Sequence, residues 1–131
     1  MNVSGKRKSA IARVSWKKGT GKLRINSLPL ERFAQPIYAL RISEPLLIAD
    51  SVAKKIDIEV SVSGGGMAGQ ADAIRLALGK TLVEASGGKA EVEKALEEYD
   101  RTLLVADVRR KEKRKPNTGG KARAKVQKSY R

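Results

Sequence analysis

The sequence contains no cysteine and no histidine among its 131 residues. The chain therefore cannot form a disulfide, a zinc site of Cys and His ligands, a thiol nucleophile or an imidazole general base. Its longest uncharged apolar stretch, residues 45–49, is far shorter than the roughly 20 residues that span a bilayer. The first nine residues carry charge without an apolar core behind them, so no secretory signal is expected. We expect a cytoplasmic protein with no cofactor, no metal and no membrane partner.

Acidic residues are scarce at both ends of the chain. There are 28 Lys and Arg residues against 14 Asp and Glu residues, a formal net charge of +14. Residues 1–24 hold eight basic and no acidic residues, and residues 101–131 hold twelve basic and two acidic residues, whereas residues 25–100 hold eight basic and twelve acidic residues. A mildly acidic body thus lies between two basic segments, which predicts a polyanionic partner such as nucleic acid.

Alternation of apolar and polar residues predicts the strands. It runs through residues 10–17 and again through 22–26, with turn residues at 18–21, and this pattern is typical of a hairpin. The polar face of that hairpin would carry Arg13, Lys17, Lys22 and Arg24. Residues 28–30 allow one short further strand, which Pro29 restricts to a sheet edge. Residues 56–63 form the clearest strand, with Ile56, Ile58, Val60 and Val62 on one face.

Helical patterns occupy three regions. Residues 31–50 are interrupted by Pro36 and Pro45, so we expect two or three short helical pieces, with apolar anchors at Ile37, Leu40, Leu47 and Ile48. The apolar pattern of residues 71–85 predicts a longer helix, and Asp72, Arg75 and Glu84 lie off its apolar face. A second short amphipathic helix is expected at 92–99, with its apolar face at Val92, Ala95, Leu96 and Tyr99.

The order β-β-β-α-β-α predicts an α+β fold, a two-layer α/β sandwich with helices on one face of a mixed sheet. The apolar pattern ends after Val105. We therefore expect a globular domain over residues 1–105 and a basic C-terminal tail over residues 106–131. The tail cannot bury enough apolar surface to order itself, so it should be disordered alone and extended when bound.

The most enzyme-like motif is Gly64-x-Gly66-x-x-Gly69, between a predicted strand and a predicted helix. A dinucleotide-binding unit would continue into a second strand that ends in an acidic residue about 20 positions on, but this interval holds Gly87, Gly88 and another helix. Two interpretations stay open. The glycine-rich turn at a helix N-terminus can bind a nucleic-acid phosphate through backbone N–H groups, or it can be a tight turn without a ligand.

The cations of the tail are arranged in separate groups along the sequence. A dense cationic cluster at residues 111–115 is followed by a flexible break at 116–120. Lys121, Arg123 and Lys125 then alternate with small apolar residues, so in an extended chain they would project on one side about 7 Å apart, close to a phosphate spacing. The end, Lys128 to Arg131, adds two cations and the aromatic Tyr130, a combination suited to single-stranded or looped RNA.

Several of these segments resemble one known family, the universal small-subunit ribosomal protein nine, in its archaeal and eukaryotic branch. The similar segments, in order, are Gly5 to Val14, Ile25-Asn26, Pro29 to Glu31, Glu44 to Leu46, Gly64 to Ala71, Tyr99 to Leu104, and Gln127 to Arg131. They cover essentially the whole chain. One departure is Val108, where that branch usually has proline before the Arg-Arg pair, and this should loosen the exit of the tail slightly.

The resemblance implies a fold with a left-handed crossover, similar to the second domain of small-subunit ribosomal protein five. It also implies a place in the head of the small ribosomal subunit, with its rRNA, neighbouring head proteins and the peptidyl-site tRNA as partners, and no catalytic residues. The tail of the family reaches toward the tRNA, and the matching positions here are Lys128, Tyr130 and Arg131.

We predict RNA contacts from the cations of both basic segments and from the glycine loop. These residues are Lys6, Arg7, Lys8, Arg13, Lys17, Lys18, Lys22, Arg24, Gly64, Gly65, Gly66, Gly69, Gln70, Arg109, Arg110, Lys111, Lys113, Arg114, Lys115, Lys121, Arg123 and Lys125. The alternative function is that of a free-standing nucleic-acid chaperone or packaging protein, which would explain the charge but not an acidic body between two separate basic ends. A nucleotide-dependent enzyme that uses the glycine loop is a third, weaker possibility.

Overall fold

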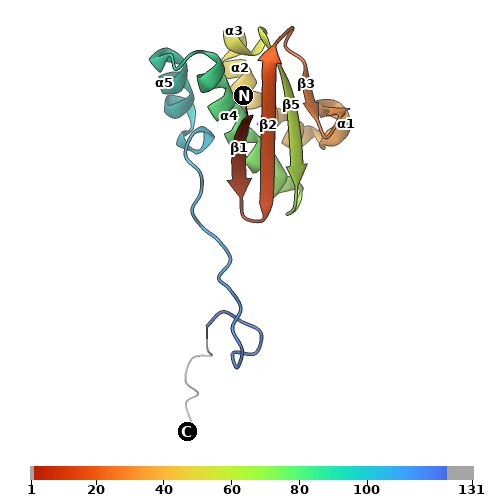
Figure 1. Ribbon diagram of the computed structural model, residues 1–131, viewed down its shortest axis with the longest axis vertical. Helices are drawn as coiled ribbons and strands as arrows, with labels where there is room; N and C mark the ends of the chain where they lie inside the picture. The colour runs from red at the N-terminus through yellow and green to blue at the C-terminus, as the bar shows by residue number, and fades with distance from the viewer. Residues whose placement is uncertain (1, 124–131) are drawn as a thin grey trace.

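A computed structural model describes residues 2–123. Its sheet strands are β1 (Asn2–Arg7), β2 (Ala10–Lys18), β3 (Leu23–Ile25), β4 (Leu28–Pro29) and β5 (Ile56–Ser63). Its helices are α1 (Leu30–Phe33), α2 (Pro36–Ile48), α3 (Asp50–Ala53), α4 (Met67–Ala85), α5 (Ala90–Tyr99) and the 3-10 helix η1 (Arg101–Leu103). Figure 1 shows the helices packed behind the sheet and the tail leading away from both, so the predicted two-layer α/β sandwich is confirmed.

The sheet order is β1-β2-β5-β3-β4, and this order corrects the predicted hairpin. β2 and β3 are not paired, because β5 lies between them, antiparallel to β2 and parallel to β3. The hairpin partner of β2 is β1, with Gly5 opposite Ala12. β5 pairs with β2 over eight residues but β3 is only three residues long, so the long ladder provides more hydrogen bonds than a local β2–β3 hairpin could.

The sequence pattern missed β1 because its residues do not alternate in polarity. Its pairing depends on the backbone ladder to β2 and on Gly5, which lies directly against α4. A Cβ built on Gly5 would lie 2.3 Å from the carbonyl oxygen of Ala73. Only glycine therefore lets this strand approach the helix so closely. At the opposite edge of the sheet, β4 contains Pro29, as the edge prediction required.

β3 and β5 are parallel neighbours joined through α1, α2 and α3. In Figure 1 both strands run downward, β5 lies to the left of β3, and the connecting helices lie behind the sheet. This arrangement is a left-handed crossover, as the resemblance implied. The general preference for right-handed crossovers would have predicted the opposite hand.

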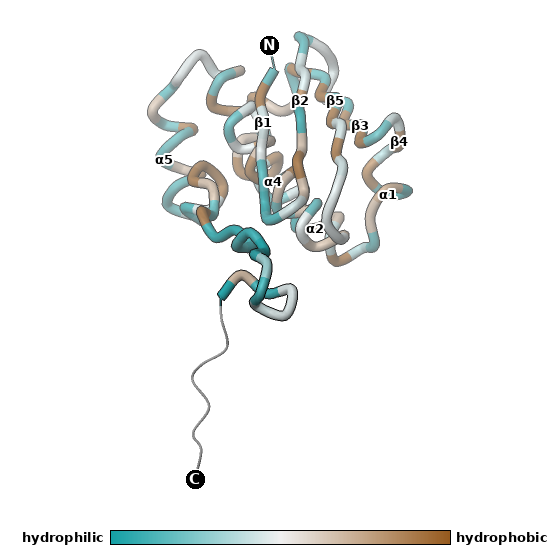
Figure 2. The backbone as a smooth tube through the Cα atoms, turned by 60° about the horizontal axis from the view of Figure 1, so that its bottom comes forward, coloured by the Kyte–Doolittle hydropathy of each residue, from teal (hydrophilic) through white to brown (hydrophobic). Residues whose placement is uncertain are grey.

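The core lies between the sheet and α4. From the sheet, Val14 and Val60 are each 1% exposed, and from the helix, Ile74 and Leu78 are fully buried. Burying four such side chains contributes roughly 6–12 kcal/mol before chain entropy is subtracted. The predicted alternation of β5 is confirmed, since Ile56, Ile58, Val60 and Val62 are all buried. In Figure 2 apolar (brown) segments occur within the sheet and the helices, whereas the chain leading into the tail is mostly hydrophilic (teal).

α2 differs from the prediction in two ways. Pro36 begins the helix, but Pro45 lies inside it instead of ending it. The expected anchors Ile37, Leu40 and Leu47 are 69%, 71% and 72% exposed, whereas Ile42 is fully buried. Because the two prolines interrupt the apolar pattern, the sequence did not show which face of α2 is buried. That face is decided by the packing of α2 on α4. On α5, the predicted anchor Tyr99 is likewise 59% exposed, and Leu96 is the buried residue.

α4 is buried on more than one side, so Arg75, predicted to lie off its apolar face, is only 6% exposed. Its guanidinium donates hydrogen bonds to Asp100 (2.8 Å) and Thr102 (3.1 Å) and forms an ion pair of 2.5 Å with Glu44 of α2. Burial alone would lower the pKa of Arg75, but Asp100 and Glu44 raise it above its ordinary value. This charged cluster links α2, α4 and η1.

Candidate nucleic-acid interface

The sheet face opposite the helices carries exposed cations on three strands. They are Lys6 on β1, Arg13 and Lys17 on β2, and Arg24 on β3. Arg13 and Lys17 are exposed because they alternate with the buried residues Ala12 and Val14. Lys22 precedes β3 and Lys18 ends β2, and both are also exposed. Lys6, Arg13, Lys17, Lys22 and Arg24 therefore share one side of the sheet, although not on a single hairpin, whereas Lys18 lies at the end of β2 beside Trp16 and Val52 on the helix side.

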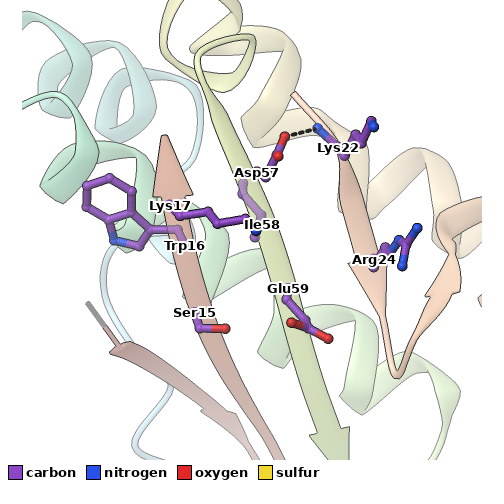
Figure 3. A pocket seen from close by; sticks show the side chains of 8 residues that line it. All are labelled: Ser15, Trp16, Lys17, Lys22, Arg24, Asp57, Ile58 and Glu59. Atoms are coloured by element: carbon purple, nitrogen blue, oxygen red, sulfur yellow. Dashed lines mark hydrogen bonds between the residues drawn. The ribbon is translucent and has the colours of Figure 1, made fainter. Parts of the chain in front are cut away.

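Two carboxylates of β5 lie between these cations, as Figure 3 shows. Glu59 is opposite Ser15 on one side and Arg24 on the other, and Asp57 is opposite Lys17. This part of the face is therefore mixed in charge.

Asp57 has a structural role that the sequence did not indicate. Its carboxylate accepts hydrogen bonds from the backbone N–H groups of Thr20 (2.8 Å) and Lys22 (3.1 Å), which fixes the loop between β2 and β3. The backbone N–H groups of Lys22 and Thr20 also lower the pKa of Asp57 below its usual value. A carboxylate that accepts hydrogen bonds from two backbone N–H groups of one loop serves to hold that loop in place.

The β1–β2 turn and the glycine loop lie next to each other, although they are more than 50 residues apart in sequence. Arg7, Lys8, Gly65 and Gly66 line one hollow at the N-terminus of α4. A Cβ built on Gly64 would lie 2.5 Å from the carbonyl oxygen of Ser9, and the φ of Gly64 is +77°. This close approach and this backbone conformation both require glycine.

Gln70 closes the glycine loop, since its side-chain amide donates a hydrogen bond of 3.1 Å to the carbonyl oxygen of Gly64. The strand–loop–helix context of β5 and α4 matches the motif. Within residues 2–123, however, only α5 and η1 follow α4, with no further strand. The second strand that a dinucleotide site requires is missing from the described fold.

The first part of the tail is fixed to the body by Asp107. Its carboxylate accepts a hydrogen bond of 2.5 Å from Arg7 and bonds of 3.0 and 2.7 Å from Arg109. Arg7 also lies 3.7 Å from Asp72, which in turn pairs with Arg41 at 3.3 Å. Of these residues, sequence reasoning missed Asp107, Asp72 and Arg41. Only Asp107 could have been noticed in the sequence, because it lies two positions before the predicted contact residue Arg109.

Further along, the described part of the tail is bent in the unbound chain, and the extended form that we expected for the bound tail stays a prediction. Residues 115–121 turn back on themselves, and Arg123 pairs with Glu112. Arg123 therefore does not project beside Lys121 as an extended strand would place it. Arg110, Lys111, Lys113, Arg114, Lys115 and Lys121 are all exposed. Lys125, Lys128, Tyr130 and Arg131 lie outside the described residues.

Most of the candidate cations in the part of the chain that the structure describes have no carboxylate partner. Among those in residues 2–123, only Arg7, Arg109 and Arg123 take part in ion pairs. No group of three metal-ligating side chains occurs in that same range, and no helix there is long and apolar enough to cross a membrane. A two-layer sandwich with unpaired cations at one turn, on one sheet face and along the described part of a tail defines a binding protein for a polyanion.

Comparison with known proteins identifies the family. The model of the family described as ribosomal protein S9/S16 matches residues 5–131. Small ribosomal subunit protein uS9 of Methanothrix thermoacetophila is 48% identical over 131 residues, with 100% of this chain and 98% of the relative covered. The uS9 proteins of Methanococcus maripaludis (48% identical, 100% and 98% covered) and Halobacterium salinarum (47% identical, 99% and 98% covered) are similarly close.

The chain belongs to the ribosomal protein S9/S16 family. Its named relatives are archaeal, in agreement with the branch inferred from the sequence. Family membership confirms a ribosomal, RNA-binding protein with a structural and not an enzymatic role.

Proposed function

We propose that this protein is a structural component of the head of the small ribosomal subunit. In this proposal it binds small-subunit rRNA, contacts neighbouring head proteins, and extends its tail toward the peptidyl-site tRNA. The names of its relatives, small ribosomal subunit protein uS9, support the first part. The observation that carries the rRNA contact is the set of exposed cations that, within residues 2–123, have no carboxylate partner at the β1–β2 turn, on the sheet face and along the tail.

The turn and the glycine loop form one proposed phosphate contact. Lys8 is exposed beside Gly65 and Gly66, where the N-terminal N–H groups of α4 begin. A phosphate there would meet both a cation and the positive end of a 19-residue helix. Gln70 supports this contact by holding the loop closed.

The sheet face and the tail provide the remaining proposed contacts. On the sheet these are Lys6, Arg13, Lys17, Lys18, Lys22 and Arg24. On the tail they are Arg110, Lys111, Lys113, Arg114, Lys115, Lys121 and Lys125, with Arg7, Arg109 and Arg123 acting through their ion pairs to hold the interface in place.

Salt dependence tests the rRNA contact. If roughly ten phosphates are neutralised, the logarithm of the affinity for an rRNA transcript should fall with the logarithm of salt concentration with a slope of about −7 to −9. Deleting residues 110–131 should make the slope shallower. A slope shallower than about −3 for the full chain would contradict the proposal.

Sedimentation tests the placement. On a sucrose gradient at physiological salt, the protein should migrate with small ribosomal subunits. Association with bulk DNA or RNA instead would favour the alternative of a free-standing chaperone, and a free pool would argue against both.

For the tRNA contact, we propose that Lys128, Tyr130 and Arg131 act at the end of the tail. The segment from residue 115 to 131 can reach roughly 50–60 Å when extended, far beyond the body. Subunits that carry a protein without residues 128–131 should assemble normally but bind tRNA about 1–3 kcal/mol more weakly in filter binding. Unchanged tRNA affinity would remove this part of the proposal, and failed assembly would show that the tip anchors rRNA.

A further inference from the structure

Residues 112–123 of the tail form a closed loop, which we call the tail loop. Figure 1 shows the chain descending from the body and then turning back in this segment. The backbone N–H of Lys115 donates to the carbonyl oxygen of Lys121 at 3.3 Å. The Thr118 hydroxyl bonds to the carbonyl oxygens of both residues. The turn itself uses left-handed backbone at Asn117, Gly119 and Gly120.

An ion pair closes the base of the tail loop. The Nε of Arg123 donates a hydrogen bond of 2.9 Å to Oε2 of Glu112, and Nη2 of Arg123 bonds to Oε1. This two-point contact is the geometry in which an Arg–carboxylate pair fixes direction as well as distance. Glu112 raises the pKa of Arg123, as expected for a paired guanidinium.

Closure gathers cations that an extended tail would separate. Six residues of extended chain span about 20 Å, whereas in the tail loop the backbones of Lys115 and Lys121 are hydrogen-bonded at 3.3 Å. Lys113 and Arg114 are exposed on the same arm as Lys115. Within residues 2–123, none of these four cations has a carboxylate partner. The tail loop therefore presents a concentrated positive charge.

If the tail acted only through its positive charge, an acidic residue such as Glu112 would have no role in it. After Asp107 it is the one acidic residue in the chain, and a carboxylate among phosphate-binding cations repels the phosphates. We propose that Glu112 is a positioning residue for RNA binding: by pairing with Arg123 it keeps the tail loop closed, so that Lys113, Arg114, Lys115 and Lys121 reach neighbouring phosphates together. This inference rests on the proposed rRNA-binding function.

The test uses two variants with the same net charge as the parent protein. The double variant Glu112→Gln with Arg123→Gln removes the pair. The swapped variant Glu112→Arg with Arg123→Glu restores a pair in the opposite direction. Affinity for the rRNA transcript is measured by filter binding at one salt concentration. We expect the double Gln variant to bind about two- to five-fold more weakly, the scale of one exposed ion pair, and the swapped variant to bind like the parent.

A single-charge comparison adds a test of sign. Glu112→Gln and Glu97→Gln each remove one exposed negative charge, and Glu97 lies on α5 away from the tail loop. Charge alone predicts that both variants bind RNA as tightly as the parent or more tightly. The tail-loop proposal predicts that only Glu112→Gln binds more weakly.

Three outcomes would overturn the proposal for Glu112. These are parental affinity in the double Gln variant, a swapped variant as weak as the double Gln variant, or tighter binding by Glu112→Gln. Failure of the parent protein itself to bind the transcript would instead refute the proposed function. Because the chain has no cysteine, spin labels at Lys111→Cys and Ala122→Cys give an independent readout, and their separation should increase in the double Gln variant.

Discussion

Arg7, at the end of the first strand, donates a hydrogen bond of 2.5 Å to Asp107, one hundred residues further along the chain. Asp107 also accepts from the side chain of Arg109, so one carboxylate joins the body to the first residues of the tail. The tail therefore leaves the body in a fixed direction. The last buried residue in the described range is Leu103, so this contact lies just beyond the end of the core.

Two truncations should separate the core from this junction. Deleting residues 110–131 leaves Asp107 and Arg109 in place and should change the free energy of unfolding by no more than about 1 kcal/mol. Deleting residues 107–131 removes the partner of Arg7 and should lower the thermal midpoint further. Thermal unfolding followed by circular dichroism makes the comparison. Loss of cooperative unfolding in the shorter deletion would show that the tail belongs to the core.

Acid should weaken the fold through two aspartates. The side chain and backbone N–H of Arg109, together with the charge of Arg7, hold the pKa of Asp107 well below its usual range. Backbone N–H groups of Lys22 and Thr20 lower the pKa of Asp57. A carboxyl whose pKa is lower in the folded state stabilises the fold above its unfolded pKa, and this stabilisation is lost as the pH falls through the folded pKa.

The free energy of unfolding should therefore decrease as the pH falls below about 4. Urea unfolding between pH 7 and pH 2 measures this dependence. In the double variant Asp57→Asn with Asp107→Asn, the decrease should be shallower. An identical pH dependence in parent and variant would show that these carboxylates do not contribute.

Two apolar residues of α2 should differ in how strongly their truncation to alanine destabilises the protein. Ile42 is fully buried and Leu40 is 71% exposed. Ile42→Ala should destabilise the protein by about 2–5 kcal/mol because it leaves a cavity against α4. Leu40→Ala should stay within about 0.5 kcal/mol. Chemical denaturation compares them, and equal losses would mean that α2 packs in a different register.

Removing the buried guanidinium of Arg75 should lower the free energy of unfolding more than removing an exposed guanidinium. Arg75→Met leaves Glu44 and Asp100 without their shared partner and should cost about 3 kcal/mol, at the lower end for a broken buried pair, since both carboxylates are about one-third exposed. Arg41→Met is the matched control, because the Arg41 side chain is 48% exposed, and should cost less than about 1 kcal/mol. Similar losses for both variants would contradict the role assigned to the buried cluster.

The sequence by itself determined the features that depend on local pattern. The alternation of β5 predicted its buried face, Pro29 predicted an edge strand, and the run of apolar residues from Ala71 to Leu82 predicted the central helix. The distribution of charge predicted a polyanionic partner. Each of these follows from neighbouring residues, whose periodicity or charge does not depend on distant contacts.

Only the tertiary structure decided which segments meet. β5 inserts between β2 and β3 because a long ladder outweighs a local hairpin, and no local pattern encodes that choice. The buried face of α2, the burial of Arg75 and the Arg7–Asp107 contact likewise depend on partners far along the chain. Pairing between distant residues is set by the packing of the whole core, and close packing allows only one arrangement. The periodicity of neighbouring residues carries no information about which distant segments pair.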